Sequence, residues 1–182
     1  MPASSTGAIR MFLRNLLKRL YVATMLQVVG RALATASRVD PVLRRELEIL
    51  PPGFQLQMTV LPAGPGVTWQ AVGGGILSRV RQAKARPELG IRFKHLEHAF
   101  LVFSFQEGTA MAFARNRMVA DGDVAVATRL VRILGRLESV ILPAPLARRA
   151  VKRYRPLRLR DKLPLAARIY LGVVRGFAQV IR

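Results

Sequence analysis

The sequence predicts an α+β domain in which a curved antiparallel sheet of about five strands packs against helices, with an amphipathic helix added at each end. Three observations predict it: alternating segments in mid-chain, helical periodicity on both sides of them, and basic chain ends. The 182 residues suffice for one domain with extensions, and 51% hydrophobic residues allow a buried core. We expect the domain at residues 32–142, between a basic amphipathic helix at 1–31 and a basic helical extension at 143–182.

The formal net charge of +20 is concentrated at the two ends of the chain. Residues 1–39 contain six basic and no acidic residues, and residues 148–182 contain eleven basic residues against Asp161 alone. Such ends predict an anionic partner, either phospholipid headgroups or nucleic acid. The absence of cysteine excludes disulfides and thiolate chemistry.

The first expected element is a helix whose apolar positions 9, 13, 16, 17 and 20 share one face, with basic residues on the other. For the more apolar segment 21–29 that follows, we expect burial or deeper contact with lipid. The same region resembles a secretory signal peptide, but Arg31 interrupts the approach to the cleavage-like sequence ALATAS, so we expect a retained helix. No run of 18 uncharged apolar residues is present, which disfavours a spanning helix.

A second helix is expected to begin after Asp40, an N-cap residue followed by Pro41, and to end at the Pro-Pro-Gly sequence 51–53. Alternating polarity then predicts strands at 54–61, 67–72, 76–82 and 88–95. We expect these four strands to form an antiparallel meander, with a hairpin turn at the three glycines 73–75.

Helices are expected at 96–106 and, with Thr109 as its cap, through Asn116. A last strand at 117–120 leads through a turn at Asp121 and Gly122 to a helix that is capped by Asp123 and ends near residue 142. The rest of the chain is expected to be helical, with breaks near prolines 156 and 164.

No arrangement of residues in the sequence predicts catalysis. His95 and His98 flank Glu97, but no third ligand is near them in the sequence, so we expect neither a metal nor another cofactor. Asp121 and Asp123 are explained by a turn and an N-cap, and the three glycines lack the Lys-Ser/Thr of a phosphate-binding loop. We therefore expect a protein that is not an enzyme.

Long apolar side chains crowd the second half of the expected domain. For any one of them, burial in the core is the simpler interpretation, but phenylalanine and methionine in such numbers suit a cavity for an irregular apolar ligand. Phe105 lies within this cluster. The residues predicted to bind the ligand are Phe93, Leu96, Phe100, Phe103, Met111, Phe113, Met118, Val126, Leu130, Ile133, Leu134 and Leu137.

The order of elements resembles the sterol carrier protein type two family over residues 32–142. The resemblance rests on the segments PGFQLQMTVL and ELGIRFKHLEHAFLVFSFQEGTAMAFARNRMVADGD and on the helix from Val124. In that family a lipid-binding tunnel lies between a curved sheet and helices, and a strand ends in Gly-Asp, as at Gly122 here. The segment NRMVADGDVAVATRLVRILGRLE is similar to the version of the domain in bacterial accessory proteins of ubiquinone biosynthesis. The chain departs from the family in its long basic ends and at residues 105–108, where FQEG replaces a common glycine.

The resemblance implies that the apolar cluster lines a pocket instead of only filling a core. Burial of an acyl or prenyl chain there would contribute about 25 cal/mol per Å² of apolar surface. The expected ligands are quinone precursors, fatty acyl lipids and sterol-like compounds, in falling order.

The basic ends are expected to bind an anionic membrane, where each basic residue adds about 1 kcal/mol. In the last helix, arginines seven residues apart form one line on an apolar surface, which suits the membrane interface. Packing of this helix on the domain is the alternative. The residues predicted to bind the membrane are Arg14, Lys18, Arg19, Arg148, Arg149, Lys152, Arg153, Arg155, Arg158, Arg160, Arg168, Arg175 and Arg182.

The expected function is that of a lipid or isoprenoid carrier, peripheral at the cytoplasmic side of the inner membrane, with biosynthetic enzymes as further partners. A nucleic-acid-binding protein is one alternative, disfavoured because aromatic residues are scarce among the basic ones and the terminal helices are apolar. The other alternative is an assembly subunit that binds partner proteins through its terminal helices.

Overall fold

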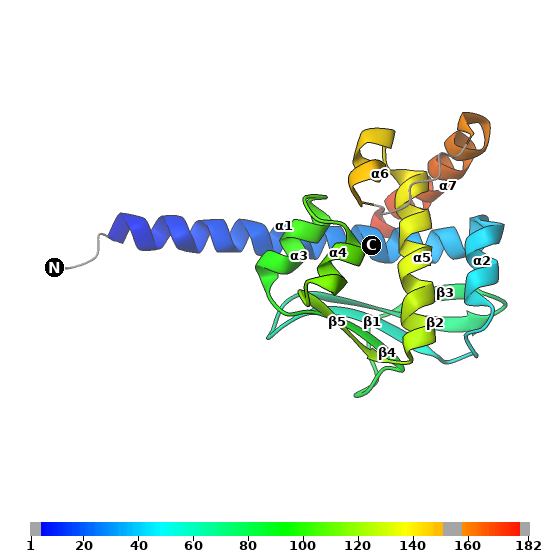
Figure 1. The fold of residues 1–182 in the computed structure, drawn as a ribbon, viewed down its shortest axis with the longest axis horizontal. Helices are drawn as coiled ribbons and strands as arrows, with labels where there is room; N and C mark the ends of the chain where they lie inside the picture. The colour runs from blue at the N-terminus through cyan, green and yellow to red at the C-terminus, as the bar shows by residue number, and fades with distance from the viewer. Residues whose placement is uncertain (1–4, 151–157, 179–182) are drawn as a thin grey trace.

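The computed structural model describes residues 5–150 and 158–178 and has the α+β fold that the sequence predicts. A five-stranded sheet is covered by helices on one face (Figure 1). The elements are α1 (Ser5–Val39), α2 (Pro41–Leu47), β1 (Gln55–Val60), β2 (Gly66–Gly73), β3 (Ile76–Val80), β4 (Leu89–Phe93), α3 (Leu96–Phe103), α4 (Thr109–Ala114), β5 (Met118–Gly122), α5 (Val124–Ile141), α6 (Ala144–Ala150) and α7 (Leu159–Ala178).

The sheet is mixed, with the strand order β3-β2-β1-β4-β5. Strands β1, β2 and β3 pair antiparallel, but β4 lies parallel to β1, with Leu89 opposite Leu56. The expected antiparallel meander is therefore wrong at its fourth strand. Alternating polarity identifies the buried face of a strand but not its neighbour. The segment that returns from β3 is held against β1 by Gln55, which accepts a hydrogen bond from the backbone of Lys84 and donates its own N–H to Glu88, both at 2.8 Å.

One face of the sheet contributes the core, and the other carries polar residues. In β1, Leu56, Met58 and Val60 are at most 2% exposed, whereas the polar residues between them are partly exposed. Trp69 of β2 and Phe93 of β4 are the largest fully buried side chains. This alternation is that of a sheet with one buried face, as the sequence predicts.

Helix α1 is a single helix of 35 residues that crosses the sheet and continues beyond it (Figure 1). Val22, Leu26 and Leu33 are fully buried, so α1 contributes core residues on both sides of the boundary expected at residue 31. The indole N–H of Trp69 donates to the carbonyl of Gly30 at 2.9 Å and fixes the helix to the sheet.

Several predicted caps and turns are confirmed. Asp40 caps α2 and Asp123 caps α5, each with a side chain that accepts two backbone N–H groups. Gly122 has φ of 130°, and a Cβ atom there would lie 2.2 Å from the carbonyl oxygen of Glu88. Only glycine therefore fits where β5 turns into α5.

The carboxylate of Asp40 also binds α5. The side chain of Asp40 is buried, and it accepts hydrogen bonds from Arg136 Nε at 2.6 Å and Arg136 Nη2 at 3.0 Å. This two-pronged ion pair sets the position of α5 over the sheet.

Three predicted helix limits are wrong. Helix α4 is capped by Gly108 instead of Thr109, and α3 ends at Phe103 because Phe105 adopts a left-handed backbone with φ of 58°. Helix α7 runs through Pro164, where a break was expected. Near the start of a helix a proline removes one interior hydrogen bond, a loss that the packing of the later turns offsets. The break expected near residue 156 lies outside the described residues.

Replacing Asp123 by alanine is expected to lower the free energy of unfolding by about 1 kcal/mol, because two N–H groups at the start of α5 lose their acceptor. Asp121→Ala is the matched control, since Asp121 is exposed and makes only a surface ion pair with Arg92. Urea denaturation followed by circular dichroism measures both. An equal decrease in the free energy of unfolding of the two variants would contradict the capping role of Asp123.

Candidate functional site

An apolar cavity of about 220 Å³ lies between the inner face of the sheet and the helices. Helices α1 and α5 supply much of its wall, the central strands supply its floor, and α3, α4 and α7 complete it. The lining residues are Met25, Val28, Val29, Met58, Phe93, Val102, Phe103, Phe105, Thr109, Met118, Leu134, Leu137, Glu138, Ile141, Leu142 and Tyr170. We refer to this space as the apolar cavity.

Helix α5 contributes its lining through helical spacing. Leu134, Leu137 and Ile141 lie three and four residues apart and therefore share one face. The ion pair between Asp40 and Arg136 anchors the helix through another face. The Asp40–Arg136 ion pair thus holds this wall of the cavity in place, although neither residue lines the cavity.

The predicted ligand-binding residues fall into three groups in the structure. Phe93, Phe103, Met118, Leu134 and Leu137 line the apolar cavity, and Phe105 joins them. Leu96, Phe100 and Phe113 pack partly buried against the core, and Met111 is 48% exposed. Val126, Leu130 and Ile133 line a separate, much smaller pocket. The ligand-binding role of the whole set stays a prediction.

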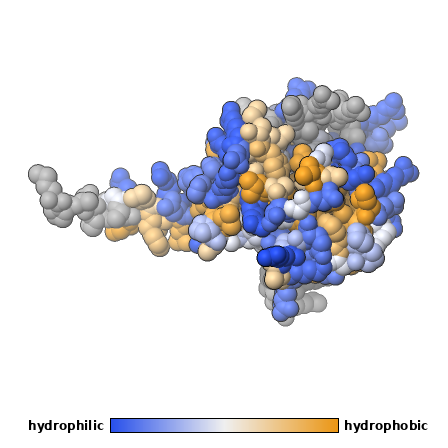
Figure 2. All heavy atoms as spheres, turned by 60° about the horizontal axis from the view of Figure 1, so that its bottom comes forward, coloured by the Kyte–Doolittle hydropathy of each residue, from blue (hydrophilic) through white to orange (hydrophobic). Residues whose placement is uncertain are grey.

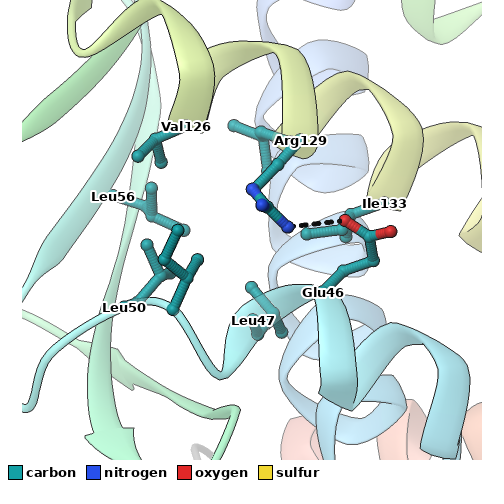
Figure 3. A pocket seen from close by; sticks show the side chains of 9 residues that line it. Glu46, Leu47, Leu50, Leu56, Val126, Arg129 and Ile133 are labelled. Atoms are coloured by element: carbon teal, nitrogen blue, oxygen red, sulfur yellow. Dashed lines mark hydrogen bonds and ion pairs between the residues drawn. The ribbon is translucent and has the colours of Figure 1, made fainter.

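That smaller pocket of about 10 Å³ lies between α5 and the end of α2 (Figure 3). Val126 of α5 points toward Leu50 and Leu56, and an ion pair of 3.3 Å between Arg129 and Glu46 lies beside them. The apolar side chains nearly fill this space, so it has no room for a ligand.

Glu138 places a carboxyl group in the wall of the apolar cavity. Its Oε1 lies 3.5 Å from the hydroxyl of Thr109, and no ion pair joins it to a cation among the described residues. Burial raises the pKa of Glu138 to about 8, against a smaller lowering by the Thr109 hydrogen bond. Near pH 7 this carboxyl is mostly protonated and has a hydrogen bond to donate.

Phe105, in the loop between α3 and α4, also lines the cavity. Its left-handed backbone, with φ of 58°, is a conformation that glycine adopts freely and that costs another residue about 1 kcal/mol. The phenylalanine therefore adds a ring to the cavity wall at a position where the backbone alone would favour glycine.

Some lining residues were missed because they lie outside the predicted cluster. Met25, Val28 and Val29 belong to the segment for which burial or contact with lipid was expected, and Tyr170 belongs to the expected membrane helix. Glu138 could have been identified from the sequence, because it is the one acidic residue of α5 and lies among the apolar positions of that helix.

The N-terminal half of α1 exposes large apolar side chains to solvent. Ile9, Phe12 and Leu17 are 57%, 67% and 65% exposed, and this part of the helix projects past the sheet (Figure 1). Apolar and hydrophilic residues alternate along it (Figure 2). We refer to residues 9–21 as the projecting segment. No described helix has a stretch long and apolar enough to span a bilayer.

Two of the predicted membrane-binding residues within this segment contact the domain. Lys18 forms an ion pair of 2.6 Å with Glu97, and Arg19 donates to the carbonyl of Ala63 at 2.9 Å. Glu97 is thereby engaged away from His95 and His98. Among the described residues no three His, Asp or Glu side chains are grouped to hold a metal ion. Arg14 is exposed.

Helix α7 packs on α1 with one face, which is the alternative to membrane contact considered above. Ile169 and Val173 are buried, and Gly172 allows close approach, because a Cβ there would lie 2.4 Å from Thr35. The opposite face keeps Leu171 and Val174 exposed. The predicted membrane residues Arg148, Arg158, Arg160, Arg168 and Arg175 are exposed, whereas Lys152, Arg153, Arg155, Arg182 and the side chain of Arg149 lie outside what the structure describes.

No protein-family model matches the chain, and no curated protein matches its sequence. Among solved structures, the chain is similar to palmitated SCP2L2 from Aedes aegypti, with 17% identity over 59% of this chain and 91% of that chain and a TM-score of 0.42. It is also similar to the conserved hypothetical protein TT1886 from Thermus thermophilus, whose description relates it to sterol carrier proteins, with 16% identity over 70% and 87% of the two chains and a TM-score of 0.43.

A third similar structure is the UbiJ-SCP2 ubiquinone synthesis protein, with 10% identity over 64% of this chain and 91% of that chain and a TM-score of 0.43. The resemblance to sterol carrier proteins that the sequence suggests thus recurs among solved structures. At these scores and identities, the similarity by itself assigns no ligand, site residue or activity to this chain.

Proposed function

We propose that this protein binds one hydrophobic lipid in the apolar cavity and carries it without catalysing a reaction. The observation that supports this most is an apolar cavity of about 220 Å³ between the sheet and the helices. Apolar cavities of about 150 Å³ stay dry and already accept small apolar molecules. Each Å² of apolar ligand surface buried there contributes about 25 cal/mol.

The polar groups in the cavity favour a ligand with one polar end. Protonated Glu138 donates a hydrogen bond and the Thr109 hydroxyl lies beside it, so a carbonyl or phenol oxygen fits there while an alkyl or prenyl chain contacts Val28 and Phe93. This chemistry supports quinone precursors first, then fatty acyl lipids and sterol-like compounds. We further propose that the protein has an accessory role in ubiquinone biosynthesis, with biosynthetic enzymes as partners.

The proposal also includes docking on an anionic membrane, at the cytoplasmic side of the inner membrane. The projecting segment supports it, because apolar side chains such as Phe12 and Leu17 are exposed there beside Arg10 and Arg14. Large exposed apolar surfaces with basic neighbours bind at the membrane interface. Exposed Arg168 and Arg175 of α7 add positive charge.

Replacing Phe12 and Leu17 together by serine is expected to weaken vesicle binding about tenfold or more, because each apolar side chain loses its transfer into the interface. Co-sedimentation with vesicles of phosphatidylglycerol and phosphatidylcholine measures it. A double variant with Val72→Ser and Val124→Ser is the matched control, since these valines are 56% and 78% exposed on the domain itself. If both double variants lose affinity alike, docking through the projecting segment is wrong.

Titration with a fluorescent fatty acid tests the binding function itself. We expect saturable binding of one probe per chain, with displacement by unlabelled prenylated phenols. Absence of saturable binding, in protein first stripped of lipid, would contradict the proposed function.

A further inference from the structure

A second pocket, of about 520 Å³, lies on the other side of α1 from the apolar cavity. It is lined by the polar residues Gln27, Arg31, Arg79 and Arg81 and by Gly66, Val67, Thr68 and Val80. Gln27 and Arg31 enter it from α1, and Arg79 and Arg81 enter it from the end of the β2–β3 hairpin. Residues 25, 28 and 29 face the apolar cavity, whereas 27 and 31 lie on another face of the helix. The two spaces are therefore separate, and we refer to this one as the basic pocket.

Arg31 is a buried cation in this pocket. Only 6% of the residue is exposed, and its guanidinium group lies over the ring of Phe177 of α7, 3.8 Å from the ring centroid. Its Nη1 donates to the backbone carbonyl and the side-chain oxygen of Gln27, both at 3.1 Å. Its Nε is buried and has no hydrogen-bond partner among the residues that the structure describes.

Arg79 brings a second guanidinium group to the same point. In β3 it follows the core residue Leu77 by two positions. The two side chains therefore share the inner face of the sheet, beneath α1. Its Nη2 donates to the side-chain oxygen of Gln27 at 2.5 Å, and its buried Nε also has no partner within residues 5–150 and 158–178. The neutral amide oxygen of Gln27 thus accepts hydrogen bonds from both Arg31 and Arg79.

The charges in the basic pocket are unbalanced. No ion pair joins Arg31 or Arg79 to a carboxylate within the described parts of the chain. Burial lowers the pKa of both guanidinium groups, and the charge of Arg31 lowers that of Arg79 further. Buried charges in proteins are ordinarily paired. An inward charge on an edge strand such as β3 discourages strand pairing, which accounts for Arg79 but not for Arg31 of the helix.

We propose that the basic pocket is a binding site for a phosphoryl group. Arg31 and Arg79 line this pocket, and exposed Arg81 lies at its rim, so the guanidinium groups of three cations offer N–H donors there. Guanidinium groups bind phosphate oxygens through paired N–H donors, and a dianion offsets two neighbouring cations where a single carboxylate would offset one. The phosphoryl group comes either from an anionic phospholipid headgroup or from a soluble phosphate compound. This site does not depend on a lipid in the apolar cavity.

The test compares Arg79→Gln with Arg45→Gln, which removes the same charge from an exposed position on α2. Calorimetric titration at constant ionic strength uses inorganic phosphate and glycerol 1-phosphate as soluble probes. Vesicles of phosphatidylcholine with and without phosphatidic acid supply the headgroup. The wild type and Arg45→Gln are expected to bind at least one source saturably, and Arg79→Gln to bind it about tenfold or more weakly.

The folded state provides a second readout. Without ligand, Arg79→Gln is expected to keep or raise the Tm, because it removes a partly buried charge that lies beside the buried charge of Arg31, whereas loss of a purely structural contact would lower it. Arg79→Lys keeps the charge but not the paired donors, and it replaces Arg79→Gln if that variant does not fold. Binding of soluble probes assigns the site to free phosphates, and binding of vesicles alone assigns it to headgroups. Absence of saturable binding to either source, or equal weakening by Arg45→Gln and Arg79→Gln, overturns the proposal.

Discussion

Replacing Val28 by phenylalanine is expected to abolish lipid binding, with a loss of affinity of about a hundredfold or more, while the protein stays folded. Val28 lines the apolar cavity and is only partly buried. The added ring has room in a space of about 220 Å³, where it occupies the place of the ligand and gains packing contacts. Titration with a fluorescent fatty acid measures the affinity, and thermal unfolding measures the stability.

Val126→Phe is the matched control for this variant. Val126 lies on the same face of α5 as the residues of the apolar cavity, but it borders the separate pocket of about 10 Å³ in Figure 3, which has no space for a ring. Overpacking is expected to cost about 1–3 kcal/mol of stability there, with unchanged binding by the molecules that remain folded. Normal binding by folded Val28→Phe would show that the ligand lies elsewhere.

Raising the pH from 5 to 9 is expected to destabilise the wild type more than Glu138→Gln. The pKa of Glu138 is about 8 in the folded protein, above its value of 4.5 in the unfolded chain, so the folded state holds the proton more tightly. The stabilisation is fully present below pH 4.5 and is lost as the pH rises through 8. Between these limits the free energy of unfolding falls by up to about 1.4 kcal/mol per pH unit.

Urea denaturation at pH 5, 7 and 9 measures this difference. Glutamine at position 138 keeps a hydrogen-bond donor and cannot ionise. The difference in free energy of unfolding between the variant and the wild type is therefore expected to change steadily in favour of the variant as the pH rises. Glu97→Gln removes an exposed carboxylate that pairs with Lys18 and serves as the control. A gap that is the same at all three pH values would mean that Glu138 is already ionised in the folded protein.

Ionisation of Glu138 has a consequence for the ligand as well. A charge that appears in an apolar cavity attracts water and removes the hydrogen-bond donor, so affinity for an uncharged lipid is expected to fall above pH 8. Glu138→Gln should bind the same lipid without this pH dependence.

Local features of the fold were predictable from the sequence because they depend on neighbouring residues. Asp40 and Asp123 were identified as caps from residue type and position, and the buried faces of the strands followed from alternation. The parallel pairing of β4 with β1 was not predictable in this way, because the neighbour of a strand is chosen by contacts distant in sequence. Pro164 shows the same limit, since packing on α1 decides the course of α7.

The candidate site was only partly predictable for a similar reason. Helical periodicity places Val126 and Leu134 on one apolar face of α5, yet one borders a filled pocket near α2 and the other borders the apolar cavity. The two residues differ in the element that packs opposite them, and the sequence pattern of α5 does not predict that element. Arg31 and Arg79 are a further case, because nothing local to either residue indicates that they meet beneath α1.

Native mass spectrometry of the protein isolated from its own cells tests most directly whether the apolar cavity holds a lipid. We expect a species heavier than the chain by the mass of one lipid, and we expect this species to be absent from Val28→Phe. Wild-type protein that emerges only at the mass of the bare chain, and that takes up no lipid when one is added, would contradict it.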